Sequence, residues 1–251
     1  MAKTISLIAA NVWCWGWLII VSMATLLVAP LWLLTAKPRG WSLARVIREG
    51  AWLYGWVYLA CIRPFVRVEV VNPHLVKEHS PVIMAGNHQS WLDLMLLATQ
   101  KERNFCILVG TWPFKRLFFF GPLIKLARNV TTEGVAADEI LRQCHREVAT
   151  GACILGYPEG TRSFDGSLGR FHSGLFKLAV ELNLPVVPVI VKNSRRIISK
   201  GSLIFRPGCI KIIFEPPIGS QMFAGEPIPH RALSKYVRQR FLKALTIAPP
   251  Q

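Results

Sequence analysis

A histidine and a carboxylate lie close together in the middle of this chain. His88 precedes Asp93 by five positions, within residues 87–93. A histidine changes its charge near neutral pH, so it can take a proton from a hydroxyl group. A carboxylate on the other ring nitrogen would fix the tautomer and stabilise the imidazolium. The pair therefore predicts a site that deprotonates a hydroxyl, provided that the chain folds Asp93 back onto the imidazole.

A second motif follows about 60 residues later, where residues 157–163 read Tyr-Pro-Glu-Gly-Thr-Arg-Ser. Arg162 offers a bidentate contact for a phosphate, and Gly160 lets the backbone approach a ligand closely. Glu159 has two possible roles, to orient Arg162 or to hydrogen-bond hydroxyl groups of the substrate. Taken alone, the histidine motif fits a helix cap and the second motif fits an exposed turn. Together they predict a site that deprotonates a hydroxyl and holds an anion.

In this order and at this separation, the two motifs resemble those of the glycerolipid acyltransferase family, which includes the bacterial 1-acylglycerol-3-phosphate acyltransferases. The resemblance covers residues 81–188 and extends less sharply to Pro217. It implies that His88 and Asp93 are catalytic. It also implies a role in acceptor binding for four residues of the second motif: Glu159, Gly160, Thr161 and Arg162.

The resemblance implies transfer of a fatty acyl group to a lyso-lipid, with 1-acylglycerol-3-phosphate giving phosphatidate. The donor would be a thioester, acyl-CoA or acyl carrier protein, and no cofactor is implied. The acceptor alcohol itself attacks, so no covalent acyl-enzyme is needed. Ser90 and Ser163 are the alternative nucleophiles, but neither lies in the Gly-x-Ser-x-Gly elbow of serine hydrolases.

One segment departs from the family pattern. The family has an Ile-Asp-Arg-like segment between the two motifs, and its arginine is thought to help hold the acceptor phosphate. Here residues 126–134 read Leu-Ala-Arg-Asn-Val-Thr-Thr-Glu-Gly, so Gly134 occupies the arginine position. Arg128 is a candidate substitute. Lys177 is a further candidate phosphate contact, although a solvated lysine on a helix explains it better. Another acceptor, such as a lyso-ornithine lipid or a lysophospholipid, is the alternative.

The charge balance restricts the partners. Thirty Lys and Arg against 14 Asp and Glu give a net charge of +16, and 52% of residues are hydrophobic. Such a charge suits nucleic acid, anionic lipid or phosphorylated substrates. The basic residues are dispersed and no nucleic-acid-binding motif is present, so we expect anionic membrane lipid and no nucleic acid. The six cysteines have irregular spacing and no C-x-x-C, which argues against disulfides and a metal site and indicates a reducing compartment.

The N-terminal region predicts a membrane anchor. Residues 5–36 contain no charged side chain and exceed the roughly 20 residues that a span needs. Two geometries fit, a single tilted helix and a helical hairpin broken near Pro30. Lys and Arg follow the segment, including Arg45 and Arg48, so we expect the remainder on the cytoplasmic side of the inner membrane. Residues 41–62, rich in Trp and Tyr, fit an interfacial helix or a helix packed on the domain.

We therefore divide the chain into membrane-associated helices at 1–63 and an acyltransferase domain at 64–251. Apolar runs predict strands at 66–70, 82–86, 105–109, 152–156, 186–191 and 210–214. Helical spacing is found at 91–99, 136–150, 175–183 and 234–245. Their alternation predicts an α/β fold with a largely parallel central sheet flanked by helices. Ser90 is the expected N-cap of the helix that carries Asp93. Three consecutive Phe within residues 113–122 predict a membrane-facing lip.

Two other functions fit parts of the sequence. A non-catalytic membrane-surface protein would use the charge and the aromatic residues, but it has no need of His88 and Asp93. A lipid hydrolase would use the same histidine with water as acceptor. Product analysis separates the last alternative, because hydrolysis yields free fatty acid.

Overall fold

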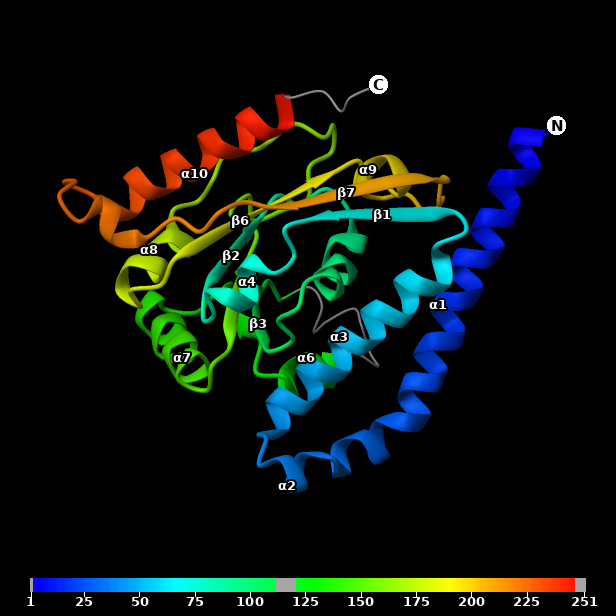
Figure 1. Cartoon of the computed structure of the whole chain (residues 1–251), viewed down its shortest axis with the longest axis horizontal. Helices are drawn as coiled ribbons and strands as arrows, with labels where there is room; N and C mark the ends of the chain where they lie inside the picture. The colour runs from blue at the N-terminus through cyan, green and yellow to red at the C-terminus, as the bar shows by residue number, and fades with distance from the viewer. Residues whose placement is uncertain (1, 112–120, 247–251) are drawn as a thin grey trace.

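The computed structural model describes residues 2–111 and 121–246. A seven-stranded sheet forms its centre, in the order β1-β7-β6-β2-β5-β3-β4 (Figure 1). The strands are β1 (Val66–Val71), β2 (Ile83–Gly86), β3 (Phe105–Val109), β4 (Val130–Thr131), β5 (Cys153–Gly156), β6 (Val186–Lys192) and β7 (Gly208–Phe214). β6, β2, β5, β3 and β4 run parallel, and β7 pairs with β6 in the opposite direction. The predicted α/β fold with a largely parallel sheet is confirmed.

Helices cover both faces of the sheet, as a parallel sheet requires. Met84 of β2 joins the core beneath α3 (Leu43–Ile62) and the 3₁₀ helix η1 (Trp91–Thr99). Its neighbours Ile83 and Ala85 point to the other core, which α8 (Gly174–Glu181) and α10 (Pro229–Thr246) help to form. α7 (Ala137–Ala149) packs beside β4, β5 and α8. All four residues of β2 and of β5 are buried, so these central strands read as continuous apolar runs.

The N-terminal helices form an antiparallel pair. α1 (Ala2–Leu34) runs into the short α2 (Ala36–Arg39), and α3 returns along it (Figure 1). Trp13 Nε1 donates to the Cys61 carbonyl at 2.7 Å near one end of the pair, and Trp32 Nε1 donates to the Val46 carbonyl at 2.9 Å near the other. α1 contains Pro30 but continues to Leu34, so of the two geometries that the sequence allowed, the one with a break near Pro30 is not found.

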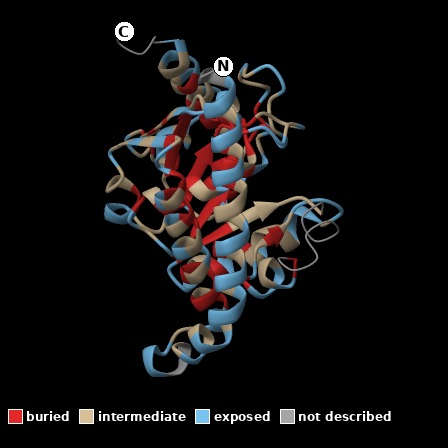
Figure 2. Ribbon diagram, turned by 90° about the vertical axis from the view of Figure 1, so that its right-hand side faces the viewer, coloured by how far each residue is buried: buried red, intermediate tan, exposed pale blue. Residues whose placement is uncertain are grey.

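The outer surface of this pair is apolar. Among the described residues, Thr4–Leu34 is the one helical segment long and apolar enough to cross a bilayer, and only 6% of its most apolar window is buried. Figure 2 shows α1 as a largely exposed helix that runs down the face turned towards the viewer. α3 buries one side against α1 and η1, as the packed alternative for residues 41–62 predicted, and it leaves Leu53 and Trp56 exposed.

Several elements differ from the sequence prediction. α10 begins at Pro229, five residues before the predicted start at residue 234. Short elements were not predicted: β4, α4 (Leu75–Glu78), α6 (Gly121–Leu126), α9 (Ser194–Ile197) and η2 (Ser220–Phe223). They are too short to show a hydrophobic period. Most of the predicted aromatic lip at residues 113–122 lies outside the described residues.

Candidate active site

The structure brings His88 and Asp93 together at the end of β2. β2 ends at Gly86, and the chain turns into η1 through His88 and Ser90. His88 Nδ1 lies 2.8 Å from Asp93 Oδ2, and the Asp93 side chain is fully buried. The same oxygen accepts the backbone N–H groups of Gln89 and Ser90 at 2.7 and 2.8 Å. Ser90 and Asp93 thus form a capping box, which confirms the prediction that Ser90 is the N-cap of this helix. The same capping interaction folds the Asp93 carboxylate back onto the histidine.

One nitrogen of this pair remains open. The His88 side chain is 18% exposed, and Nε2 has no hydrogen-bond partner within the described residues. Because Asp93 accepts a hydrogen bond from Nδ1–H, it favours the tautomer in which Nε2 carries the lone pair. Asp93 Oδ1 is buried and also unpartnered among the described residues. The arrangement can therefore accept a proton at Nε2 and stabilise the resulting imidazolium.

Tyr157, which the sequence did not mark as a site residue, packs directly on the histidine. Its ring stacks on the His88 ring with centroids 4.0 Å apart and an interplanar angle of 16°. Gly86 leaves space for this ring, since a Cβ there would lie 3.1 Å from Tyr157 Cε1. Burial and the Asp93 charge raise the pKa of Tyr157 well above its usual value, so the phenol stays neutral. Its position directly before the Pro-Glu-Gly-Thr-Arg-Ser motif is the signal that the sequence offered.

Glu159 makes two backbone contacts that the sequence did not suggest. Its Oε1 accepts the His88 backbone N–H at 2.9 Å, and its Oε2 accepts the Gly169 N–H at 2.8 Å. The carboxylate is buried and joins the histidine loop to the loop that follows β5. A second bond, from the Ser163 N–H to the His88 carbonyl at 2.8 Å, holds the same two loops together. Gly160 has φ +69°, a left-handed conformation that glycine adopts without strain.

The predicted anion-binding residues lie on this second loop. Thr161 is exposed and Arg162 is half-buried. The loop is supported by a residue that sequence analysis did not identify, Lys200. Its Nζ donates to Thr161 Oγ1 at 3.0 Å and to the Arg162 carbonyl at 3.1 Å. Nothing in the sequence pattern around residue 200 indicates this contact, because it joins positions almost 40 residues apart.

Two other predicted contacts do not join this group. Arg128 comes just before β4, whereas His88 follows the carboxyl end of the parallel strand β2, so the two residues lie at opposite edges of the sheet. The Arg128 guanidinium instead lies 3.8 Å from Glu147. The prediction that Arg128 compensates for Gly134 is therefore not supported by the geometry. Lys177 is exposed on α8, and its ammonium has no partner among the described residues.

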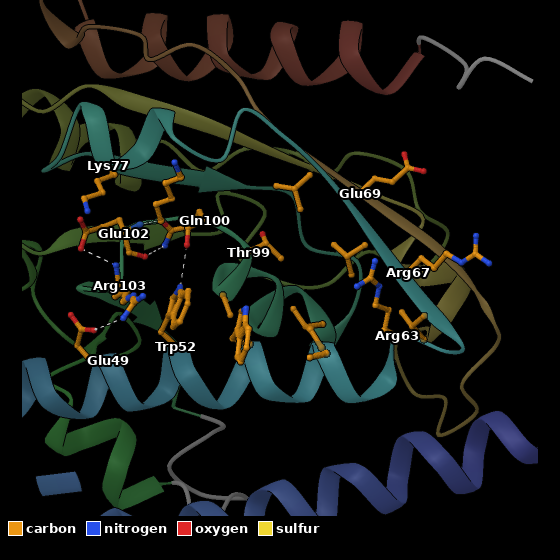
Figure 3. A pocket seen from close by; sticks show the side chains of 18 of the residues that line it. Glu49, Trp52, Arg63, Arg67, Glu69, Lys77, Thr99, Gln100, Glu102 and Arg103 are labelled. Atoms are coloured by element: carbon orange, nitrogen blue, oxygen red, sulfur yellow. Dashed lines mark hydrogen bonds and ion pairs between the residues drawn. The ribbon is translucent and has the colours of Figure 1, made fainter.

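A large groove lies away from the histidine. It has a volume of about 1140 Å³ and separates α3 from β1 and the end of η1 (Figure 3). Figure 3 shows Trp52 and Arg103 at one end and Arg63 and Arg67 at the other. η1 begins near His88, and its last residues, Ala98 and Thr99, line the groove, so its nine residues, at ~2.0 Å each, put that part of the groove roughly 18 Å from the histidine. Among the described residues, no group of His, Cys, Asp and Glu could hold a metal ion.

Comparisons with known proteins agree with this geometry. Residues 67–192, half of the chain, match the model of the acyltransferase family. The chain is 28% identical over 205 residues to the human 1-acyl-sn-glycerol-3-phosphate acyltransferase beta, which covers 74% of this chain and 70% of that protein. It is 29% identical over 160 residues to the chloroplastic enzyme BAT2 of Brassica napus, covering 62% of this chain and 46% of that protein. The match thus spans about half the length of the plant relative.

A solved structure shows the same fold over the whole chain. The crystal structure of the 1-acyl-sn-glycerophosphate acyltransferase PlsC from Thermotoga maritima superposes with a TM-score of 0.75, at 19% identity and full coverage of both chains. At this identity the likeness concerns the fold alone. The family match carries the assignment: the chain belongs to the acyltransferase family.

Proposed function

We propose that the protein transfers a fatty acyl group from a thioester, acyl-CoA or acyl carrier protein, to the free hydroxyl of a lyso-lipid. The proposed acceptor is 1-acylglycerol-3-phosphate and the product is phosphatidate. The observation that carries this proposal is the 2.8 Å contact between His88 Nδ1 and Asp93 Oδ2, with Nε2 left without a partner among the described residues. The backbone of His88 is also hydrogen-bonded to the turn that bears Arg162. The relatives named above, which are 1-acyl-sn-glycerol-3-phosphate acyltransferases, support the choice of acceptor.

The reaction follows from these groups. The lyso-lipid hydroxyl donates a hydrogen bond to His88 Nε2 and loses its proton to that nitrogen as its oxygen attacks the thioester carbonyl. Asp93 stabilises the imidazolium that forms. The tetrahedral intermediate collapses, the C–S bond breaks, and the thiolate takes the proton from Nε2. The new ester leaves and His88 returns to its neutral form, so no enzyme nucleophile is consumed.

The surroundings of the pair support each part of this role. Tyr157 stacks on the imidazole and limits its rotation. Glu159 fixes the backbone of His88 relative to the turn that carries Thr161 and Arg162. The acceptor phosphate would contact Arg162, whose planar guanidinium suits two phosphate oxygens.

The proposal includes a membrane location. The exposed apolar surface of α1, with Trp56 and Leu53 on α3, supplies a surface that lipid would cover. Residues 1–63 would hold the protein on the inner membrane, and residues 64–251 would form the acyltransferase domain on the cytoplasmic side. Both substrates could then meet at the histidine, the lyso-lipid from the bilayer and the thioester from the cytosol.

The test is an acyl-transfer assay on purified membranes. Labelled acyl-CoA and acyl carrier protein thioesters are offered with lysophosphatidate, lyso-ornithine lipid and other lysophospholipids, and the lipid products are identified. Labelled phosphatidate is the expected product, and it should disappear with His88→Ala. Conversion of another lyso-lipid alone would mean that Gly134 marks a changed acceptor site. Release of free fatty acid without a diacyl product would indicate a hydrolase, and vesicle binding without turnover would indicate a binding protein.

A further inference from the structure

Lys200 occupies a defined position at the same edge of the sheet as His88. It follows β6 and α9, and β6 runs parallel to β2, so this segment leaves the sheet beside the histidine loop. A hydrogen bond from Ser90 Oγ to the Ile198 carbonyl at 2.8 Å connects the two loops. The Lys200 ammonium lies 3.9 Å from the centroid of the Phe164 ring, which is itself 72% exposed.

One peptide group separates the ammonium from the histidine backbone. Lys200 Nζ donates to the Arg162 carbonyl at 3.1 Å, and the N–H of the same peptide, on Ser163, donates to the His88 carbonyl at 2.8 Å. A peptide group is planar and rigid. The ammonium therefore lies within about 8 Å of the His88 carbonyl oxygen, allowing for the two hydrogen bonds and the peptide between them. That separation places the ammonium beside the loop that carries His88.

The charge of Lys200 is not neutralised by a carboxylate. Its partners are a hydroxyl, a carbonyl and an aromatic ring, and no ion pair involves Lys200 within the described residues. A lysine ammonium has three N–H donors, so one remains for a ligand. Arg195 adds a second cation to the turn, because its Nε donates to the Phe164 carbonyl at 2.6 Å.

The turn contains one exposed acid, which does not pair with Lys200. Asp165 accepts from the Ser163 hydroxyl at 3.1 Å and from the Ser167 hydroxyl at 2.7 Å. These donors lower the pKa of Asp165 to about 2, so it stays ionised near neutral pH. Arg162, Arg195 and Lys200 together still outnumber it, and the turn keeps a positive potential towards anions.

We infer that Lys200 acts with Arg162 to bind the phosphate of the acceptor and so selects lyso-lipids that carry an anionic headgroup. This inference rests on the proposed function. Gly134 has no side chain to offer and Arg128 lies at the opposite edge of the sheet, so among the described residues we assign the positive charge to the turn that carries Arg162 and to Lys200 beside it. Arg162 provides a planar fork for two phosphate oxygens, and Lys200 provides a compact charge for the third.

The experiment compares Lys200→Met with Lys200→Arg, and with Lys235→Met on α10 as a matched control for loss of an exposed lysine. The KM for lysophosphatidate, kcat, and the inhibition constant of glycerol 3-phosphate, used as a soluble headgroup, are measured for each. Lys200→Met should raise both the KM and the inhibition constant by about 10- to 100-fold, the usual cost of a lost charge-assisted hydrogen bond. Its kcat should change by less than about threefold. Lys200→Arg should recover most of the affinity, and Lys235→Met should behave as the wild type.

Two results would overturn the inference. One is an unchanged KM and inhibition constant in Lys200→Met. The other is a fall in kcat alone, which would reduce Lys200 to a support of the loop. If the wild type converts no lyso-lipid, the proposed function fails, and titration calorimetry of glycerol 3-phosphate on the wild type and Lys200→Met then decides the inference alone. Equal binding by the two proteins would contradict it.

Discussion

The two edges of the parallel sheet each contain a cluster of ionisable side chains, but the two clusters differ in which atoms are left without a partner. At the amino edge, Arg48 Nη2 lies 2.6 Å from Glu147 Oε2, and the other guanidinium nitrogens donate to the Ala127 carbonyl and to Asn104 Oδ1. At the carboxyl edge, Asp93 binds His88, yet Nε2 of the histidine and Oδ1 of the aspartate have no partner among the described residues. The first cluster is closed and the second is open.

The difference shows that residue type alone does not distinguish a structural charge from a reactive one. Removing one partner of a closed, buried ion pair leaves a charge without compensation, so we expect the damage to fall on stability. Removing one partner of the open pair changes the protonation of Nε2, so we expect the damage to fall on rate. Each prediction below tests that separation.

The largest effect is expected for Asp93→Asn. The amide keeps the shape but removes the charge and favours the wrong histidine tautomer, so the transfer rate should fall by about 10³- to 10⁴-fold. Initial rates with a saturating thioester measure it. Glu147→Gln is the matched carboxylate-to-amide change at the other edge and should leave the rate per folded molecule unchanged. Equal rate losses in the two variants would remove the distinction between the edges.

Arg48→Met should lower the stability of the fold and leave the rate of the folded enzyme unchanged. The methionine fills part of the volume but leaves Glu147 buried without its main partner, which should lower the free energy of unfolding by about 3–5 kcal/mol. Denaturant titration measures this change, and kcat is measured at a temperature where the variant stays folded. A free energy of unfolding equal to that of the wild type would show that the Arg48–Glu147 cluster contributes little to stability. A large fall in kcat of the folded variant would show that this cluster also affects catalysis at His88.

Glu159→Gln should have a smaller effect on rate. The amide nitrogen cannot accept a hydrogen bond, so the N–H of either His88 or Gly169 loses its partner. We expect a loss of about 10-fold in rate, the effect of one unpaired buried donor. Hydrogen exchange of residues 160–169 should also rise. Increased exchange with an unchanged rate would mean that the bond between the loops does not position the histidine.

The smallest effect is expected for Tyr157→Phe. The ring that stacks on His88 is kept, and only the hydroxyl is lost. Burial and the Asp93 charge raise the pKa of Tyr157, so the phenol is protonated throughout the neutral range and its removal should change kcat by less than about threefold. The pH–rate profile of the variant should have the same shape as that of the wild type. A profile that changes at alkaline pH in this variant would show that the phenol takes part in proton transfer.

Local features of the site could be predicted from the sequence because they depend on neighbouring residues. A few neighbouring positions determine three features: the strand before His88, the N-cap at Ser90 and the contact of the Asp93 side chain with His88. The partners of Glu159 and Lys200 could not be predicted, since those contacts depend on which strands are neighbours in the sheet. Arg128 was misplaced for the same reason.

Arg48 shows a second limit of sequence patterns. The positive-inside rule counts it as one of the basic residues that follow an apolar segment, yet the structure buries it to 3% exposure beside Glu147. Composition near a membrane segment does not reveal a carboxylate 99 residues further along the chain. The largely parallel sheet itself was predicted correctly, because alternating strands and helices constrain topology more than they constrain individual contacts.

The most direct test of the central claim is a double-mutant cycle on the open pair. The rate of acyl transfer is measured for the wild type, His88→Ala, Asp93→Asn and the double variant, with stability checked by thermal unfolding. If the two residues act as one general-base unit, the double variant will be no slower than His88→Ala alone. Losses that multiply in the double variant, or full activity in His88→Ala, would contradict the account.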